Sequence, residues 1–271
     1  MNLFSIPAIH TSKINWQNRK VILDLTLRDF RLRYVGSMLG RYWNLINPLA
    51  MITIYTIIFS KVMGARLGNI TNPYAYTVYL CAGLLPWNAL AELISRGTNV
   101  FLEHAYLIKK VSFPKELLPA VVVGSTSVNF LISFALLFGL ILVTGHQLSF
   151  VIAGVAVVFF LQLIFLFGLI CFLGTLNVFF RDIQQAVSIV LQIWFWLTPV
   201  VYLESAVPER FVSLLRINPF YYFVTAYHDL IFWSRWPTSS TLATCAGISV
   251  FFFVLGTSFF AKFKDQIADE I

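Results

Sequence analysis

Long and almost uncharged apolar segments constrain the fold of this chain more than any other feature of its sequence. Residues 130–143 and 151–172 are apolar at nearly every position, and their only strongly polar side chains are Ser133 and Gln162. A helix needs about 20 such residues to cross the hydrocarbon core of a bilayer. Strands of a membrane barrel would instead alternate apolar and polar residues over segments of about ten. The pattern therefore predicts an all-α membrane protein.

Composition supports this prediction, because the chain has too few charged residues to cover the surface of a soluble domain. Hydrophobic residues make up 59% of the 271 residues and charged residues 11%, whereas soluble domains carry about 25% charged residues. Six segments are long enough to cross the membrane: residues 44–64, 76–97, 117–143, 149–177, 185–203 and 239–261. We expect a polytopic domain of six transmembrane helices, 44–261, between cytoplasmic segments 1–43 and 262–271.

The distribution of Lys and Arg predicts the orientation of these helices. An even number of crossings leaves both termini on one side of the membrane. With the termini in the cytoplasm, the inner segments carry fourteen basic residues and the outer segments five, in agreement with the positive-inside rule. The net charge of +7 therefore reflects topology and does not indicate nucleic-acid binding. The first 43 residues lack the apolar core of a cleaved signal peptide, so we expect the first crossing to direct insertion.

Residues 15–34 are expected to form an amphipathic helix in the inner membrane interface. Two apolar stripes run along it: one contains Leu23, Leu27, Phe30 and Tyr34, and the other contains Val21, Leu25 and Leu32. Such a helix would place one stripe in acyl chains and the other against protein. The basic residues that would contact anionic headgroups are Arg28, Arg31 and Arg33. The alternation of leucines at 23, 25 and 27 is also compatible with a strand.

The outer connection before the last crossing, residues 203–238, is long and rich in aromatic residues. Thirteen of the 43 residues from Trp194 to Trp236 are aromatic, compared with 17% of the whole chain. Aromatic side chains concentrate where protein meets the membrane interface, and backbone at that depth must satisfy its own hydrogen bonds. We therefore predict short interfacial or re-entrant helices at the periplasmic mouth, between crossings five and six.

The sequence contains none of the motifs that would give this chain a catalytic, cofactor or metal site. No Lys is followed by Ser or Thr, which excludes the phosphate-binding loop GxxxxGK[ST]. The four His residues lack the spacing of metal ligands, Cys81, Cys171 and Cys245 are isolated in apolar runs, and Gly-x-Ser-x-Gly is absent. Glu92 lies inside the second crossing, where a carboxylate is costly and often marks a substrate path. Arg96, four residues later, favours a structural ion pair.

The inner loop after the second crossing is predicted to contain a short helix that docks against a cytosolic partner. Residues 103–113 are suitable for such a helix, and Pro114 and Pro119 would separate it from the next crossing. Tyr106 and Lys110 lie on one helical face at i and i+4, where they would offer a ring and a charge to a groove. The alternative is a basic inner loop without a partner.

Several segments of the sequence resemble those of one membrane-protein family. Residues 28–53, RDFRLRYVGSMLGRYWNLINPLAMIT, resemble the N-terminal signature of ABC-2-type permeases that export bacterial cell-surface polysaccharides. Residues 99–120, NVFLEHAYLIKKVSFPKELLPA, resemble the first cytoplasmic loop of the same family. Further matches are AGLLPWN at 82–88, NVFFRDI at 177–183 and INPF at 217–220. Together these segments run in order over most of the chain.

The resemblance implies a half-transporter in the bacterial inner membrane. Two copies of this permease would pair with two copies of a separate nucleotide-binding ATPase subunit, which would hold ATP and Mg, so this chain would be no enzyme. The family's coupling helix corresponds to residues 103–113, and its interface helix fits residues 15–34. The candidate coupling residues are Glu103, His104, Tyr106, Leu107, Lys109 and Lys110. Substrates of the family are lipid-linked O-antigen, capsule or teichoic-acid polymers.

Aromatic residues at two places in the chain are candidates for a polysaccharide path. The C–H faces of sugar rings pack on indole and phenol rings through weak, repeated contacts, which hold a polymer but let it slide. The candidates are Tyr42, Trp43, Trp194, Trp196 and Tyr202. The alternative role for these rings is to anchor helices at the membrane interface, where Trp and Tyr concentrate.

Two other functions are compatible with parts of the sequence. One is an ABC-2 exporter of a drug or small lipid, which would share the helix count and the coupling helix. The other is a membrane-embedded glycosyl- or acyltransferase, for which the adjacent His228 and Asp229 are the only hint. Neighbouring residues point to different faces of a helix, so this pair is weak evidence for an enzyme.

Overall fold

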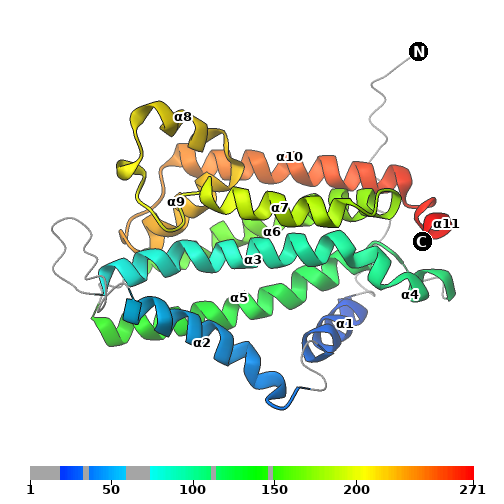
Figure 1. Ribbon diagram of the computed structural model, residues 1–271, viewed down its shortest axis with the longest axis horizontal. Helices are drawn as coiled ribbons and strands as arrows, with labels where there is room; N and C mark the ends of the chain where they lie inside the picture. The colour runs from blue at the N-terminus through cyan, green and yellow to red at the C-terminus, as the bar shows by residue number, and fades with distance from the viewer. Residues whose placement is uncertain (1–18, 33–36, 59–73, 111–113, 146–148) are drawn as a thin grey trace.

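The computed structural model describes residues 19–32, 37–58, 74–110, 114–145 and 149–271 (Figure 1). Within these ranges the chain forms helices and turns and contains no strand, which confirms the predicted all-α class. The helices are α1 (Arg19–Leu32), η2 (Gly40–Tyr42), α2 (Trp43–Tyr55), α3 (Ala75–Glu103), α4 (Ala105–Lys110), α5 (Leu117–Thr144), η4 (Phe150–Ala153), α6 (Gly154–Phe179), α7 (Ile183–Trp196), η5 (Glu204–Ala206), α8 (Glu209–Ile217), α9 (Pro219–Ile231), α10 (Ser239–Phe263) and α11 (Ile267–Glu270).

Four helical segments of the described chain are long and apolar enough to cross a membrane. They are Ala75–Glu103, Leu117–Thr144, Phe150–Phe179 and Ser239–Phe263. Two shorter apolar helices cover Trp43–Ile58 and Ile183–Trp196, in the first and fifth of the six expected crossings. The structure therefore has several apolar helices, as in a polytopic membrane protein. Residues 59–64 of the first expected crossing lie outside the described residues.

The fifth expected crossing, residues 185–203, differs from the helix in the structure. α7 ends at Trp196 and is followed by turns. Pro199 has no backbone N–H and disfavours helical geometry in the preceding Thr198. The Thr198 hydroxyl donates a hydrogen bond to the carbonyl of Trp194 at 2.8 Å. A helix of 14 residues is about 21 Å long, less than the roughly 30 Å of a hydrocarbon core.

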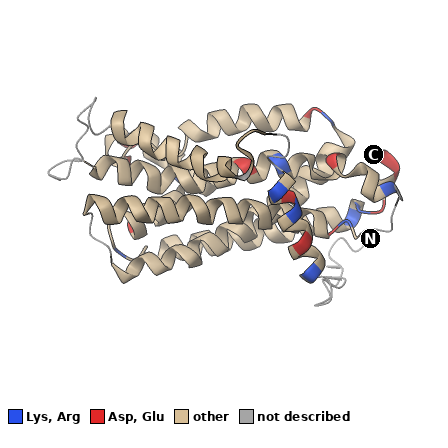
Figure 2. Cartoon of the chain, turned by 90° about the horizontal axis from the view of Figure 1, so that it is seen from below, with Lys and Arg blue, Asp and Glu red and all other residues tan. Residues whose placement is uncertain are grey.

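The long helices lie side by side, and the short ones gather at the two ends of the bundle (Figure 1). α6 and α10 form the most extensive helix pair, and α3 packs against α5, α6, α7 and α9. α2 lies on α5, and α1 crosses α5 near the end that also carries α4 and α11. α8 and α9 lie at the opposite end. Figure 2 shows that charged residues concentrate toward the end with α1, α4 and α11.

Glycines allow α6 to approach its two principal neighbours closely. A methyl group on Gly256 of α10 would overlap the backbone carbonyl of Gly168 on α6. A methyl group on Gly174 of α6 would lie 2.8 Å from the carbonyl oxygen of Gly97 on α3. Small residues at such crossings let backbones pack without an intervening side chain, as is common in membrane helices. α6 therefore packs closely against both α3 and α10.

Candidate functional site

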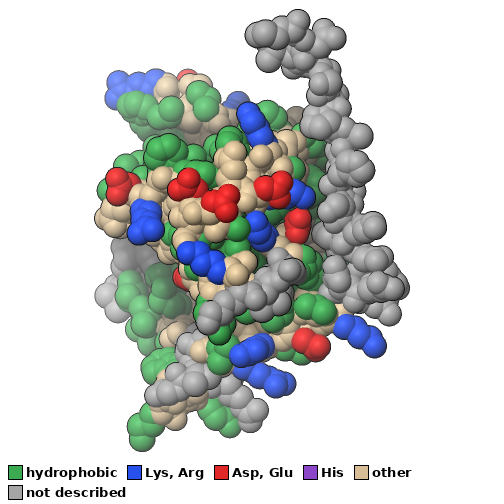
Figure 3. Space-filling model, turned by 90° about the vertical axis from the view of Figure 1, so that its right-hand side faces the viewer, with side chains coloured by type: hydrophobic (Ala, Val, Ile, Leu, Met, Phe, Trp, Pro, Cys, Tyr) green, Lys and Arg blue, Asp and Glu red, His purple; other side chains and the backbone are tan. Residues whose placement is uncertain are grey.

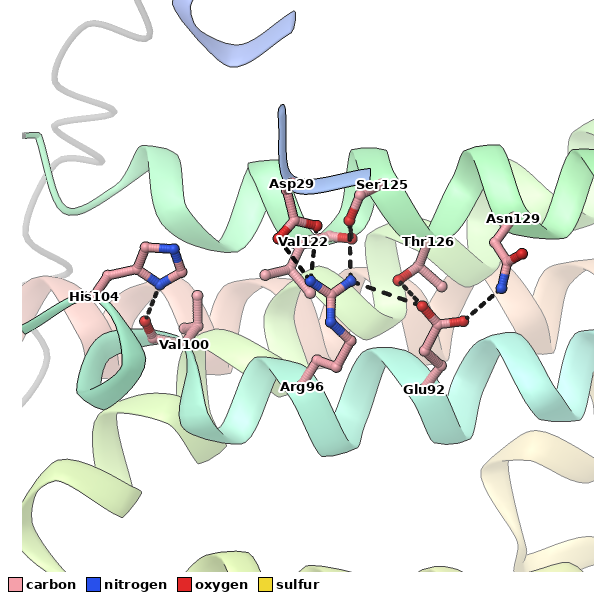
Figure 4. A network of polar contacts seen from close by, with 9 residues as sticks. All are labelled: Asp29, Glu92, Arg96, Val100, His104, Val122, Ser125, Thr126 and Asn129. Carbon is pink, nitrogen blue, oxygen red and sulfur yellow. Dashed lines mark hydrogen bonds and ion pairs between the residues drawn. The ribbon is translucent and has the colours of Figure 1, made fainter. Parts of the chain in front are cut away.

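A polar network joins α1, α3 and α5 inside the bundle (Figure 4). The guanidinium of Arg96 on α3 donates to both carboxylate oxygens of Asp29 on α1, at 2.9 and 2.7 Å. It also donates to the hydroxyl of Ser125 on α5 at 3.0 Å. Both contacts with Asp29 come from one nitrogen, Nη2, while Nη1 bonds Ser125, and hydrogen bonds between charged groups are stronger than neutral ones. Arg96 therefore holds three helices at one point.

Glu92 continues this network along α3. Its carboxylate lies 3.7 Å from the Arg96 guanidinium, which confirms the ion pair predicted from the spacing. The hydroxyl of Thr126 donates to one of its oxygens at 3.1 Å, and the amide of Asn129 donates to the other at 3.0 Å. A carboxylate within a membrane helix requires such partners. The shorter pair with Asp29 could not be predicted, because no sequence spacing relates Asp29 to Arg96.

α1 confirms the helix, rather than the strand, in the N-terminal segment, and the face that packs on α5 contains Thr26. Thr26 is buried where Gly124 of α5 leaves room for it, since a methyl group on Gly124 would lie 2.8 Å from the Thr26 hydroxyl. Leu23 and Leu27 are exposed, and Phe30 is half-buried. Arg28 and Arg31 are also exposed, while Arg33 and Tyr34 lie outside the described residues. The Asp29 contact with Arg96 determines which face meets α5.

The segment expected to couple to an ATPase contains a short helix, α4, which follows α3 after a break at His104. Glu103 is the last residue of α3, and the His104 ring bonds to the carbonyl of Val100 at 2.9 Å. Tyr106 is 66% exposed. The remaining candidates differ: Lys109 is exposed, Leu107 is half-buried, and the side chain of Lys110 lies outside the described part, as do residues 111–113. Pro119 does not separate α4 from α5, because it lies in the first turn of α5, where proline is tolerated.

The C-terminal segment packs against α4 at the same end of the bundle. α11 packs against α4 and α6, and the side chain of Ile267 is fully buried. Lys115 Nζ donates to the carbonyl of Lys264 at 2.7 Å, and Lys264 Nζ lies 3.6 Å from Glu116. Residues 262–271, expected as a tail, are thus part of the folded bundle. Figure 3 shows acidic and basic side chains interspersed on this end of the molecule.

The aromatic residues expected along a polysaccharide path fall into different environments. On α7, Trp194 is half-buried, its indole N–H donates to Asn218 at 2.6 Å, and its ring packs edge-on against Trp87. Trp196 is 67% exposed. The Tyr202 hydroxyl donates to the carbonyl of Trp196 at 2.9 Å. Trp194 is thus a packing residue, whereas Trp196 offers its ring to the surroundings.

Tyr42 and Trp43 lie far from this group within one chain. They precede and begin α2, toward the end of the molecule that carries α1, whereas α7 ends toward α8 and α9 (Figure 1). Tyr42 is exposed, and the indole N–H of Trp43 donates to Ser37 at 2.8 Å. α2 packs on α5, while α7 packs on α3 and α6. A single chain therefore does not bring the five candidate rings together.

Short helices, η5, α8 and α9, form the connection between α7 and α10. Asn218 organises them: its side chain accepts from the backbone N–H of Phe220 at 2.9 Å and donates to the hydroxyl of Thr198 at 2.8 Å. Asparagine at this position caps α9, and Pro219 begins it, which is the favoured order at a helix start. Asn218 also accepts from Trp194, so it fixes the end of α7 against α9. The INPF segment was notable in the sequence, but this role was not predicted.

His228 and Asp229 have separate partners and do not form a catalytic pair. The His228 ring stacks on Tyr79 with centroids 3.9 Å apart. Asp229 pairs with Arg235 at 2.7 Å. Burial raises the pKa of Asp229, although the nearby Arg235 guanidinium acts in the opposite direction. Among the residues that the structure describes, no three His, Cys, Asp or Glu converge as metal ligands.

Comparison with known proteins identifies the family. Residues 21–232 match the ABC-2 type transporter family. The chain belongs to this family. It is 30% identical to the O-antigen export system permease protein RfbA of Myxococcus xanthus, over 94% of this chain and 97% of the relative. It is 32% identical to a protein of the same name from Klebsiella pneumoniae, over 92% and 94% of the two chains.

A more distant relative is the polysialic acid transport protein KpsM of Escherichia coli, which is 23% identical over 77% of this chain and 80% of the relative. ABC-2 type proteins of this kind are membrane subunits of transporters. Membership of the family therefore excludes the reading of this chain as a membrane-embedded transferase, in agreement with the separate partners of His228 and Asp229.

Proposed function

We propose that this ABC-2 protein is the permease subunit of an exporter that moves a lipid-linked, O-antigen-like cell-surface polysaccharide across the bacterial inner membrane. The observation that carries the proposal is similarity over nearly the full length to two O-antigen export permeases. The similarity to a polysialic acid transport protein also favours a polymer over a drug or small lipid. The exposed rings near the ends of α2 and α7 agree with a sugar substrate.

The proposal includes a topology and an assembly. The short helices α2 and α7 would complete six crossings with both termini in the cytoplasm, which the bias of basic residues supports. α1 would lie in the inner interface with Arg28 and Arg31 toward headgroups, and α8 and α9 would be re-entrant. Two permease copies would pair with two copies of a separate ATPase subunit, which would bind ATP and Mg. The lack of a phosphate-binding loop in this chain supports a separate energy source.

Coupling would begin at α4. This helix adjoins α3, the most extensively buried of the spanning helices. Closure of the ATPase dimer against Tyr106 and its neighbours would push on α3, and Arg96 would transmit the displacement to α1 through Asp29. Binding energy in one subunit would thereby shift a two-state membrane element in another. α11, anchored by its buried Ile267, would hold α4 in position when the ATPase presses on it.

Replacing both Tyr106 and Lys110 with alanine is expected to abolish export while leaving membrane insertion intact. Tyr106 is exposed and contributes no core packing, so its loss removes the docking surface without unfolding the bundle. The measurement is surface polysaccharide in cells whose own copy of the gene is deleted and replaced by the variant. Phe150→Ala, which removes an even more exposed ring at the opposite end of the bundle, is the control. Normal export by the double variant at equal expression would contradict the role of α4.

Trp196→Ala is expected to lower the export rate about two- to tenfold, because an aromatic contact contributes about 0.5–1.5 kcal/mol and each 1.4 kcal/mol is a factor of ten. ATPase binding to the variant should be unchanged. Trp194→Phe serves as comparison: it removes the hydrogen bond to Asn218 and should lower stability by about 1 kcal/mol. The measurements are export in cells and thermal stability in detergent. Unchanged export by Trp196→Ala would assign the ring to membrane anchoring.

A further inference from the structure

A polar pocket lies between α2, α3 and α5, outside the coupling region and away from the ring-rich end of α7. Its volume is about 150 Å³. Its polar lining comes from Asn47 and Tyr55 of α2, Asn88 and Glu92 of α3, and Asn129 and Ser133 of α5. Two of these three helices are long and apolar enough to span the membrane. The rest of its lining is apolar, and within a membrane the polar side chains of such a pocket need water or a hydrogen-bonding ligand.

Two asparagine side chains, Asn47 and Asn88, line the pocket. Asn88 lies halfway along α3, and Asn47 lies in the second turn of α2. Both residues are exposed in the single chain. Neither side chain has a hydrogen-bond partner within the described part of the protein. An amide without a partner costs several kcal/mol in hydrocarbon, so these two groups must meet water or a hydrogen-bonding ligand.

Glu92 lines another part of the pocket, and its ionised carboxylate can only accept hydrogen bonds. Glu92 is held by Thr126 and Asn129 and lies beside Arg96. Carboxylate oxygens accept hydrogen bonds, whereas the amides of Asn47 and Asn88 both donate and accept. The ring of Phe130 closes one side, where it is buried. Alternating donors and acceptors beside an aromatic ring match the hydroxyl groups and C–H faces of a sugar.

We propose that this pocket binds one sugar residue of the exported polymer, an inference that rests on the proposed function. The pocket is partly open, and its volume of about 150 Å³ leaves room for a single sugar ring. An acyl chain would leave the amides without partners. A phosphate group would be repelled by Glu92, whose neighbouring Arg96 is already engaged by Asp29.

The test replaces each amide with leucine, which has the same branched shape and number of heavy atoms but no hydrogen-bonding group. Asn88→Leu and Asn47→Leu are each expected to lower export about five- to tenfold, as expected for one hydrogen bond to a sugar hydroxyl at about 1 kcal/mol or slightly more. Retention of labelled polysaccharide, released from the same cells by mild acid, should fall equally in the purified complex with its ATPase in lipid nanodiscs. Asn88→Gln keeps the amide and should retain most of the export.

The control is Val157→Leu, an exposed apolar position on α6 outside the pocket, which should export normally. Leucine at position 88 suits a lipid-facing surface, so a variant that assembles normally but exports like wild type would overturn the inference. If the Asn88→Leu variant no longer pairs with a second permease copy, the amide belongs to the interface between the copies. That result would also overturn the inference of a sugar-binding pocket. If wild-type cells themselves show no dependence of surface polysaccharide on this chain, the proposed function fails instead.

Discussion

Replacing Gly256 with leucine is expected to prevent stable packing of α10 on α6. Even the first carbon of a side chain at this position would overlap the carbonyl of Gly168, and backbone atoms cannot move aside as a side chain can. Overpacking of a core costs about 1–3 kcal/mol and occasionally more, so we expect a loss of at least about 3 kcal/mol for this backbone clash. The measurement is the yield of monodisperse protein in detergent and its midpoint of thermal aggregation.

Gly247→Leu is the matched control, because Gly247 lies on the same helix and a methyl group there would have no neighbour within 4 Å. It is exposed, and leucine suits a helix surface that faces lipid. The aggregation midpoint of this variant should equal or exceed that of the wild type. A similar loss in both variants would show that glycine acts through helix geometry and not through the contact with α6.

Replacing Arg96 with methionine is expected to destabilise the protein by roughly 3 kcal/mol, because removal of one partner leaves buried charges uncompensated. Asp29 and Glu92 would both lose their contact with Arg96, and the side chains of Arg96 and Asp29 are only 26% and 21% exposed. α1 should detach from the bundle, since Asp29 joins it to Arg96 of α3, which in turn bonds Ser125 of α5. The measurements are the thermal aggregation midpoint and protease cleavage within α1.

Arg96→Lys separates charge from geometry. Lysine keeps a positive charge, but its single ammonium group replaces only the nitrogen that bonds Asp29 and not the second nitrogen that bonds Ser125, so we expect an intermediate loss of stability. A double-mutant cycle between Asp29→Ala and Arg96→Ala should give a coupling energy of at least about 1 kcal/mol. A coupling energy near zero would mean that the pair does not hold α1 in place.

In the N-terminal segment, the periodicity of apolar residues predicted the secondary structure but not the tertiary contacts. The apolar spacing in residues 15–34 predicted a helix, and α1 confirms one over residues 19–32. It did not predict which face packs. Leu23 was expected in an apolar stripe and is 60% exposed, whereas Thr26 is buried. Asp29 decides the orientation through a partner 67 positions away in sequence, and local periodicity contains no information on such contacts.

For the candidate polysaccharide path, the sequence likewise did not distinguish the environments of the two tryptophans of α7. Trp194 and Trp196 are the same residue type, two positions apart, and both fitted a sugar-binding role. In the structure Trp194 donates to Asn218 and packs on Trp87, while Trp196 is exposed. The difference arises because residues two apart on a helix point to different sides. Only the position of α9 shows which of these sides is covered.

Sequence by itself determined that this protein is helical, membrane-embedded and without a phosphate-binding loop of its own, since apolar length and the presence of a motif are properties of contiguous residues. Resemblance over most of the chain determined the family, which the comparisons confirmed. Tertiary structure alone decided that Arg96 joins three helices, that Gly168 and Gly256 permit close packing, and that Asn47 and Asn88 face one pocket. Each of these depends on distances between helices that are remote in sequence, and packing of the whole bundle sets those distances.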